Sequence, residues 1–345
     1  AFLFLGTMTV SPIFAQRIDL KGGSVDVDVQ GNTTNWNVQG NPVWEMPEFN
    51  VAQGSIYNIA GLGQNASLAV LVNGGSISNI FGTMNLSNLA FILQIIAGIN
   101  IGASAMINVN NASLIASTLP LNLTATDFLK HDYQFGDGKS RQGLLMNAGR
   151  IIGTNADLVA LVGTAIENRG VIEVPMGTVA LAAGKTVAVG ISPDGMVTIG
   201  VDEATANELG LADQIKNSGT ISAKGCRVVL NAKAVDGLFD KAINLVSEPN
   251  AVSVIKADDG MIEFVAKGDI RNAGTIQAER GSVTMATDGA IENSGTINAK
   301  TFRENGYSFK TTGTITGGEA FYDNLDGAAN ISGNIGSNQS DVGNL

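Results

Sequence analysis

The feature that most constrains the fold of this chain is a seven-residue motif with an apolar residue, Asn, Gly and then Ile or Val at alternate positions. It occurs at residues 145–151, 166–172, 215–221, 270–276 and 291–297. Its polar positions are Asn147, Gly149, Asn168, Gly170, Asn217, Gly219, Asn272, Gly274, Asn293 and Gly295. The glycines are 21, 49, 55 and 21 residues apart, which indicates a unit of about 21 residues. The two longer spacings are interpreted as two units with about seven and thirteen inserted residues.

A second apolar segment of period two often follows the motif, as at 178–184, 227–232 and 282–287. A strand of about five residues cannot bury its apolar face alone, but strands stacked ~4.8 Å apart pair their backbones and share one core. Asn and Gly suit a turn with left-handed backbone geometry, and Asn amides can bond from coil to coil. The sequence therefore predicts an all-β chain folded as a parallel β-helix, a single-stranded solenoid. A leucine-rich repeat has a similar period, but its regular leucines and helical return are missing.

The two insertions have patterns of their own. Residues 187–191 and 196–201 flank a Ser-Pro-Asp-Gly turn, which predicts a β-hairpin projecting from the solenoid. We expect a short helical piece over residues 203–210 after it. In the second insertion, at 236–260, residues 237–243 are expected to form one helical turn that covers the core.

The first third of the chain is unusual because the 78 residues between Glu48 and Asp127 contain no Lys, Arg, Asp or Glu. Such a segment cannot form a helix bundle with a charged surface. Its most apolar part, residues 89–99, is about half as long as a bilayer-spanning helix. We therefore predict a buried β-strand there and no transmembrane segment.

Charge and composition exclude several functions. The net charge is -11, which repels nucleic acid and anionic membrane surfaces. His131 and Cys226 are the only residues of their kinds, so disulfides, most zinc sites and most histidine-dependent catalysis are not expected.

The two ends indicate export. Residues 1–15 are apolar and end in a small residue, the pattern of the second half of a secretory signal peptide, with cleavage expected after Ala15. The alternative is a buried N-terminal strand. Residues 324–345 are rich in Asn, Gly and Ser, and we expect the native chain to continue beyond them.

Five stretches, at 47–54, 75–83, 105–109, 114–119 and 179–184, resemble a known family when taken together with the coil motif. They are similar to the N-terminal secretion domain of filamentous-haemagglutinin-type exoproteins, the passengers of two-partner secretion. The resemblance spans roughly residues 30–300. It implies a right-handed parallel β-helix capped by N-terminal strands. It also implies export by the general secretory route and recognition by a dedicated outer-membrane β-barrel transporter through its periplasmic POTRA domains.

The resemblance also assigns recognition residues. The family's Asn-Pro-Asn-Gly-Ile motif falls at residues 95–99, where only the last two positions match, and an earlier Asn-x-x-Leu-like element corresponds to residues 65–68. The residues expected to serve transporter recognition are Asn65, Leu68, Gly98 and Ile99.

We expect four parts of the chain. They are a signal peptide remnant at 1–15, the N-terminal cap and first coils of the secretion domain at 16–143, β-helix repeats at 144–323, and the start of a continuing C-terminal region at 324–345.

No catalytic, cofactor or metal site is expected. Residues 61–66 match a dinucleotide-binding glycine motif, but nothing acidic follows before Asp127, so we expect no cofactor. The adjacent acids 258–259 lack the alternating ligand spacing of a calcium loop. Three sets of ionisable residues could in principle serve lyase or hydrolase chemistry, but each is expected to lie in a solvated turn. They are Asp202 with Glu203, Asp258 and Asp259 with Glu263, and Lys267 with Arg271.

Together these features predict a non-enzymatic exoprotein at the surface of a Gram-negative-type bacterium or in its medium. We expect this part of it to serve secretion and display, and adhesion to a host-cell, matrix or glycan receptor to be carried mainly by residues beyond Leu345. The alternative is a β-helical carbohydrate-active enzyme or carbohydrate-binding module, which needs three or more ionisable side chains converging on a groove across adjacent coils. A third possibility is a self-associating fibre formed through an uncapped end.

Overall fold

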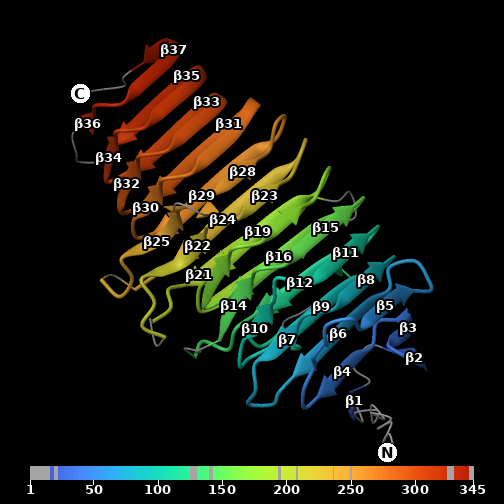
Figure 1. The fold of residues 1–345 in the computed structure, drawn as a ribbon. Coiled ribbons are helices and arrows are strands. Elements are labelled where there is room, and N and C mark those ends of the chain that lie inside the picture. The colour runs from blue at the N-terminus through green and yellow to red at the C-terminus, as the bar shows by residue number, and fades with distance from the viewer. Residues whose placement is uncertain are drawn as a thin grey trace, which may run out of the picture.

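The computed structural model describes residues 16–18, 22–124, 130–139, 143–192, 196–206, 209–235, 237–248, 251–324 and 330–341. Within this part of the chain every regular element is a β-strand and there is no α-helix. Figure 1 shows an elongated stack of coils with the two termini at opposite ends. The expected signal segment at 1–15 lies outside the described residues.

Four strands form the N-terminal cap: β1 (Gln16–Ile18), β2 (Gly23–Gln30), β3 (Thr33–Gly40) and β4 (Val43–Met46). β2 and β3 are an antiparallel hairpin, and β3 then pairs in parallel with the first strand of the stack. Trp36 is the centre of an aromatic cluster and lies 5.3–5.9 Å, centroid to centroid, from Trp44, Phe49 and Tyr57. These rings cover the end of the core, so the expected N-terminal capping strands are confirmed.

Each coil contributes strands to three parallel runs. The first run contains β5 (Ile56–Gly61), β8 (Thr83–Ser87), β11 (Met106–Asn110), β15 (Arg150–Thr154), β18 (Val171–Glu173), β23 (Thr220–Ser222) and β28 (Val254–Lys256). The second run contains β6 (Ser67–Val72), β9 (Ala90–Ile95), β12 (Ser113–Ser117), β16 (Leu158–Gly163), β19 (Thr178–Ala183), β24 (Arg227–Lys233) and β29 (Met261–Lys267). Both runs continue into the long strands β31 (Thr275–Thr287), β33 (Thr296–Gly306), β35 (Thr314–Asn324) and β37 (Asn334–Asp341).

The third run is a separate ten-stranded sheet. It contains β7 (Ser78–Ile80), β10 (Ile99–Ile101), β14 (Leu144–Asn147), β17 (Ala165–Asn168), β22 (Asp213–Asn217), β25 (Lys241–Leu245), β30 (Ile270–Asn272), β32 (Ala290–Asn293), β34 (Ser308–Thr311) and β36 (Asn330–Ile331). Its neighbouring strands pair in parallel, and together the three runs form the parallel β-helix that was predicted.

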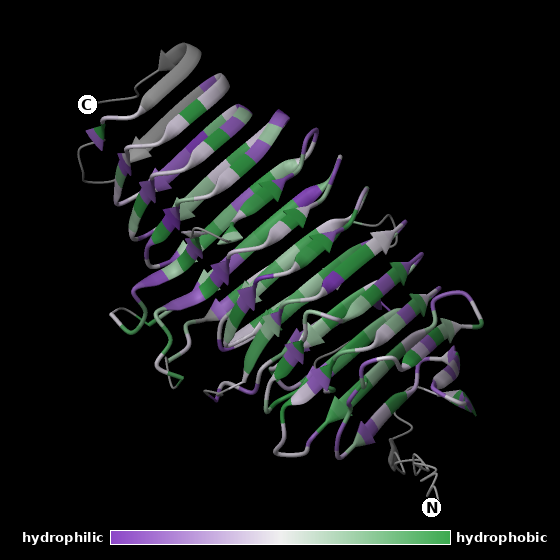
Figure 2. Cartoon of the chain, viewed as in Figure 1, coloured by the Kyte–Doolittle hydropathy of each residue, from purple (hydrophilic) through white to green (hydrophobic). Residues whose placement is uncertain are grey.

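The core consists of aligned columns of identical or similar side chains. One column of isoleucines, each at most 2% exposed, runs through the first-run strands and their continuations at Ile151, Ile172, Ile221, Ile255, Ile276, Ile297 and Ile315. In Figure 2 the hydrophobic colour recurs at corresponding places on successive strands. Stacking equal residues on equal residues fills the interior without steps between coils.

The register corrects one prediction. Gly170 and Gly219 belong to adjacent coils, because the strands that flank them pair directly, Ile166 with Ile215 and Val171 with Thr220. The 49-residue spacing is therefore one coil with a long excursion, and the interpretation as two units was wrong. The 55-residue spacing does span two coils, since β25, β28 and β29 lie between its glycines.

The excursion contains the predicted hairpin. β20 (Thr186–Ile191) and β21 (Val197–Glu203) pair antiparallel, and β13 (Asp132–Phe135) adds a third strand. We call these three strands the accessory sheet. It lies against the outer face of the second run, where Tyr133 and Val189 pack with Ala160 and Ala180 in a second hydrophobic cluster.

Both predicted helical pieces were wrong within the described residues. The segment from 203 begins in strand β21, and Thr205 then bridges to Ala234, while residues 207–208 lie outside the described part. In the second insertion, residues 241–245 form β25, and a short hairpin of β26 (Ser247–Glu248) and β27 (Ala251–Val252) follows. The exposed edge of β22 requires a partner, and this tertiary pairing outweighs local helix propensity.

The apolar segment at 89–99 contains the buried strand that was predicted, β9, followed by a turn and the first residue of β10. All six residues of β9 are buried. No helix among the described residues has the length and apolar character needed to cross a membrane.

Candidate functional site

The motif asparagines form a ladder inside the solenoid. Asn147 Nδ2 donates to Asn168 Oδ1 at 2.8 Å, Asn168 Nδ2 donates to Asn217 Oδ1 at 2.7 Å, and all three side chains are fully buried. A buried amide is costly unless it is paired, so the ladder fixes the register of the coils at this corner.

The ladder is interrupted at the second insertion. Leu245 stacks between Asn217 and Asn272, and Asn217 Nδ2 donates instead to Ser253 Oγ at 2.6 Å. The ladder then resumes from Asn272 to Asn293 at 2.8 Å and ends on the hydroxyl of Thr311. The hydroxyls of Ser253 and Thr311 therefore replace asparagine amides.

The glycine column has a steric cause and is longer than the motif indicated. A Cβ on Gly219 would lie 2.1 Å from the carbonyl oxygen of Gly170, and a Cβ on Gly295 would lie 2.1 Å from that of Gly274. The same close approach occurs at Gly313 and Gly333. These two glycines do not match the motif, because the asparagine two positions before the glycine is absent there.

Sequence reasoning also missed a second ladder, outside the core. Asn58, Asn85 and Asn108 each donate through Nδ2 at 2.8 Å to the asparagine of the preceding coil, beginning at Asn35. The asparagines occupy equivalent positions in β3, β5, β8 and β11. Neutral amide pairs thus link the coils of the uncharged first third.

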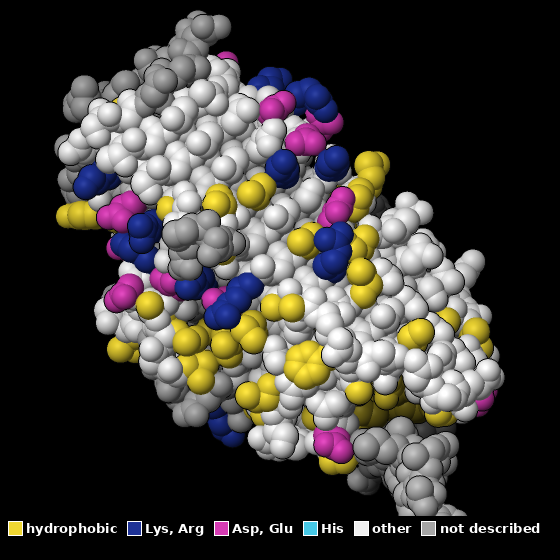
Figure 3. Space-filling view, in the orientation of Figure 1, with side chains coloured by type: hydrophobic (Ala, Val, Ile, Leu, Met, Phe, Trp, Pro, Cys, Tyr) yellow, Lys and Arg dark blue, Asp and Glu magenta, His cyan; other side chains and the backbone are white. Residues whose placement is uncertain are grey.

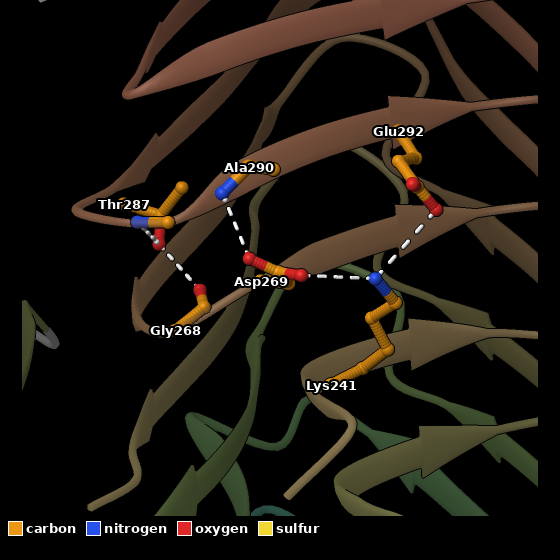
Figure 4. A network of polar contacts seen from close by, with 7 residues as sticks. Lys241, Gly268, Asp269, Thr287, Ala290 and Glu292 are labelled. Atoms are coloured by element: carbon orange, nitrogen blue, oxygen red, sulfur yellow. Dashed lines mark hydrogen bonds and ion pairs between the residues drawn. The ribbon is translucent and has the colours of Figure 1, made fainter. Parts of the chain in front are cut away.

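A charged network links the later coils at another corner (Figure 4). Lys241 Nζ lies 3.0 Å from Asp269 Oδ2 and 3.6 Å from Glu292 Oε2, and the other oxygen of Asp269 accepts the backbone N–H of Ala290 at 2.9 Å. These contacts connect β25, the start of β30 and β32. The groups pair with one another, which is a structural arrangement.

The four predicted recognition residues do not form one surface. Leu68 and Ile99 are 0% and 1% exposed and belong to the solenoid core. Asn65 lies in the exposed turn before β6, with φ 57°, whereas Gly98 lies in the turn after β9. Since β6 and β9 are parallel neighbours, the two turns lie at opposite ends of the second run.

Ionisable groups gather in one shallow depression of about 470 Å³, lined in part by Arg227, Asp259, Arg280 and Lys300. Asp259 pairs with Arg280, and Glu263 pairs with Arg227. The bond from Arg280 lowers the pKa of Asp259, so this carboxylate is held ionised and is a poor proton donor. Figure 3 shows Lys, Arg, Asp and Glu scattered in mixed pairs over the later coils.

The remaining candidate groups are dispersed. Lys267 and Arg271 lie on strands of different sheets, β29 and β30. Cys226 is a partly buried free thiol. Among the described residues, no three His, Cys, Asp or Glu side chains are grouped so that they could hold a metal ion.

His131 precedes β13 with a left-handed φ of 52°. Its Nδ1 lies 2.9 Å from the Tyr133 hydroxyl. Burial lowers the pKa of His131, with a smaller opposing effect from Asp157. The ring is therefore neutral at neutral pH.

These features describe a capped parallel β-helix whose charged side chains form ion pairs between coils. The chain belongs to the TPS secretion domain family, whose model matches residues 21–278. It is thus the secretion domain of a two-partner secretion exoprotein, a class defined by secretion and not by an enzymatic reaction. Proteins with this domain are secreted by Gram-negative bacteria to the surface or medium.

Solved structures agree with this fold. The HMW1 secretion domain from Haemophilus influenzae has a TM-score of 0.62 at 18% identity, covering 95% of this chain and 98% of that one. The filamentous hemagglutinin secretion domain has a TM-score of 0.53 at 16% identity, covering 92% and 96%. At this identity the likeness shows the fold alone. No curated protein matches the chain by sequence.

Proposed function

We propose that this domain is the export signal of a non-enzymatic adhesin, recognised in the periplasm by the POTRA domains of an outer-membrane β-barrel transporter. The observation that carries the proposal is the membership in the TPS secretion domain family over residues 21–278. The receptor of the adhesin would be a host cell, a matrix component or a glycan. A signal peptide at 1–15 would direct the chain to the periplasm.

Recognition acts on the chain before it folds. Leu68 and Ile99 would serve as recognition residues, and both are inside the folded core. Asn65 and Gly98 are at opposite ends of the second run, so a single partner surface reaches all four residues only when the chain is extended.

The composition of the first third suits passage through a pore. The 78 residues between Glu48 and Asp127 carry no charged side chain, so none of them pays the large free-energy cost of removing a charge from water. Each coil that emerges gains a backbone partner and a share of the core from the coil before it. Stacking outside the cell therefore favours outward movement without nucleotide hydrolysis.

The test is binding of the chain, kept unfolded in mild denaturant, to the isolated POTRA region of the transporter encoded beside its gene. Wild type is expected to bind saturably, and Leu68→Ala combined with Ile99→Ala to weaken binding about tenfold or more, a loss of two buried contacts. Leu161→Ala with Ile221→Ala is the matched control, since both residues are core positions outside the proposed recognition segments.

Equal weakening by both pairs of substitutions would show that the POTRA region recognises general hydrophobicity and not these particular residues. Absence of binding by the wild-type chain would refute recognition of the unfolded domain by POTRA.

A further inference from the structure

A groove in the N-terminal half of this domain lies at the corner where the first run turns into the second. It has a volume of about 560 Å³, within the range of about 300–1,000 Å³ typical of small-molecule sites. The floor comes from three successive corners, at 61–66, 88–90 and 111–113 (β5 to β6, β8 to β9 and β11 to β12 in Figure 1). His131, Asp157 and residues 191–192 form the walls.

The floor carries a row of oriented amides. Asn65, Asn88 and Asn111 each have a left-handed φ between 51° and 57° and an exposed side chain. Asn111 Nδ2 donates to Asn88 Oδ1 at 2.9 Å, which fixes both side chains relative to each other. An asparagine amide has two donor hydrogens and two acceptor lone pairs, so one bond leaves donors and acceptors available to a ligand.

The walls supply two further hydrogen-bonding groups and apolar surface. Tyr133 holds one nitrogen of the His131 ring at 2.9 Å and thereby orients the ring. Asp157 is an exposed carboxylate, the group that accepts the strongest hydrogen bonds from a hydroxyl. Leu62, 64% exposed, adds an apolar patch at the rim.

The charge of the groove excludes anionic ligands. Among its described lining residues, no Lys or Arg balances Asp157, and His131 is neutral at neutral pH. The chain as a whole carries a net charge of -11. A phosphate, sulfate or carboxylate would therefore be repelled.

The backbone of the floor excludes an added peptide strand. Asn88 N–H donates to Asn110 C=O and Asn111 N–H donates to Thr154 C=O, so these corner groups are already paired. A peptide that binds as an extra strand needs an edge of unpaired N–H and C=O groups. A ligand that offers its own donors and acceptors, without charge, fits the groove better.

We propose that this groove binds a neutral oligosaccharide. Its hydroxyls would bond the amides of Asn88 and Asn111 and the carboxylate of Asp157, and its C–H faces would contact Leu62. The proposal rests on the adhesin role proposed above and names the class of receptor. Binding is measured on the folded chain, so its failure is distinct from a failure of transporter recognition.

The experiment screens the folded 345-residue chain against immobilised neutral glycans, namely lactose, N-acetyllactosamine and mannotriose, and their sialylated and sulfated counterparts. The best binder is then titrated against Asn88→Gly, Asn111→Gly and Asn155→Gly. Glycine accepts the left-handed backbone without strain, so each variant loses only its amide. Asn155 has the same φ of 51° and an exposed side chain but is not part of the groove, which makes it the matched control.

Binding to a neutral glycan is expected, with affinity lower by about fivefold to tenfold in each of the two groove variants, as for the loss of one hydrogen bond, and unchanged in Asn155→Gly. Thermal midpoints of the three variants should agree. The proposal is overturned if none of the neutral glycans binds, if charged glycans bind better, or if the groove variants and the control bind alike.

Discussion

At the scale of single residues, the glycine column shows how steric exclusion sets the sequence. Each motif glycine lies against the backbone of the residue one coil below, a glycine in four cases and Ser253 in the case of Gly274, so any side chain would have to displace a coil. Glycine therefore recurs at this motif position because there is no room for a Cβ. The asparagine two positions earlier forms a side-chain hydrogen bond to the asparagine of the next coil.

Replacing Gly219 by Ala should destabilise the domain strongly, by on the order of 2–4 kcal/mol, because the new Cβ would lie 2.1 Å from the carbonyl oxygen of Gly170. Gly200→Ala is the control, since its Cβ would meet only the Cβ of Ala188 at 3.8 Å. Urea unfolding followed by circular dichroism measures both. Equal midpoints for the two variants would contradict the steric account.

His131 predicts a pH dependence of stability. Burial holds the pKa of His131 below its ordinary value of 6.5 in the folded state, so the unfolded chain binds the proton more tightly. The stabilisation is complete above pH 6.5 and is lost as the pH falls through 6.5 toward the lower folded value.

The measurement is the thermal midpoint between pH 7.5 and pH 5. Wild type should lose more stability over this interval than His131→Asn, a substitution that tolerates the left-handed backbone and removes the only histidine. An identical slope for both proteins would assign the pH dependence to carboxyl groups instead.

At the scale of elements, the accessory sheet explains why the second-run strands are apolar on both faces. Val159 and Leu161 point into the solenoid, while Leu158 and Ala160 belong to the outer cluster with Tyr133 and other residues of β13, β20 and β21. A strand buried on both sides reads as a continuous apolar run, and here the cover comes from elements distant in the sequence.

Introducing a charge under the accessory sheet should detach it without unfolding the solenoid. Val189→Asp places an unpaired carboxylate in the outer cluster, which costs several kcal/mol. Hydrogen exchange is expected to show lost protection in β13, β20 and β21 and retained protection in β18 and β23. Thr198→Asp, at an exposed position of the same hairpin, is the control and should leave the exchange pattern unchanged. Loss of protection throughout the chain would show that the sheet and the solenoid unfold as one unit.

At the scale of the whole molecule, the chain changes its means of linking coils along its length. The first third uses neutral asparagine pairs, such as Asn58 with Asn35, whereas the later coils add ion pairs, such as Lys241 with Asp269, to their inner asparagine ladder. Both satisfy polar groups between stacked coils, but only the neutral pairs leave the segment proposed for recognition without charge.

Sequence alone predicted the β-helix and the inner asparagine column, because a period of about 21 residues with Asn and Gly at one corner is a local pattern that stacking repeats. The hairpin was predicted from its turn signal, and the capping strands were implied by the family resemblance. The sequence did not predict that a single coil with a long excursion follows Gly170, and it wrongly predicted the two helical pieces. The reason is that the spacing between motifs does not show which strands pair with each other.

The groove that includes residues 61–66 could likewise not be predicted from the sequence, in which these residues resemble only an incomplete dinucleotide-binding motif. Its walls come from His131, Asp157 and residues 191–192, up to 131 positions away from Gly61 in the sequence. The sequence determined which residues repeat, because each coil must match its neighbours. Only the tertiary structure decided which distant segments cover the outer face and meet at a corner, because those contacts depend on where the chain returns after leaving the stack.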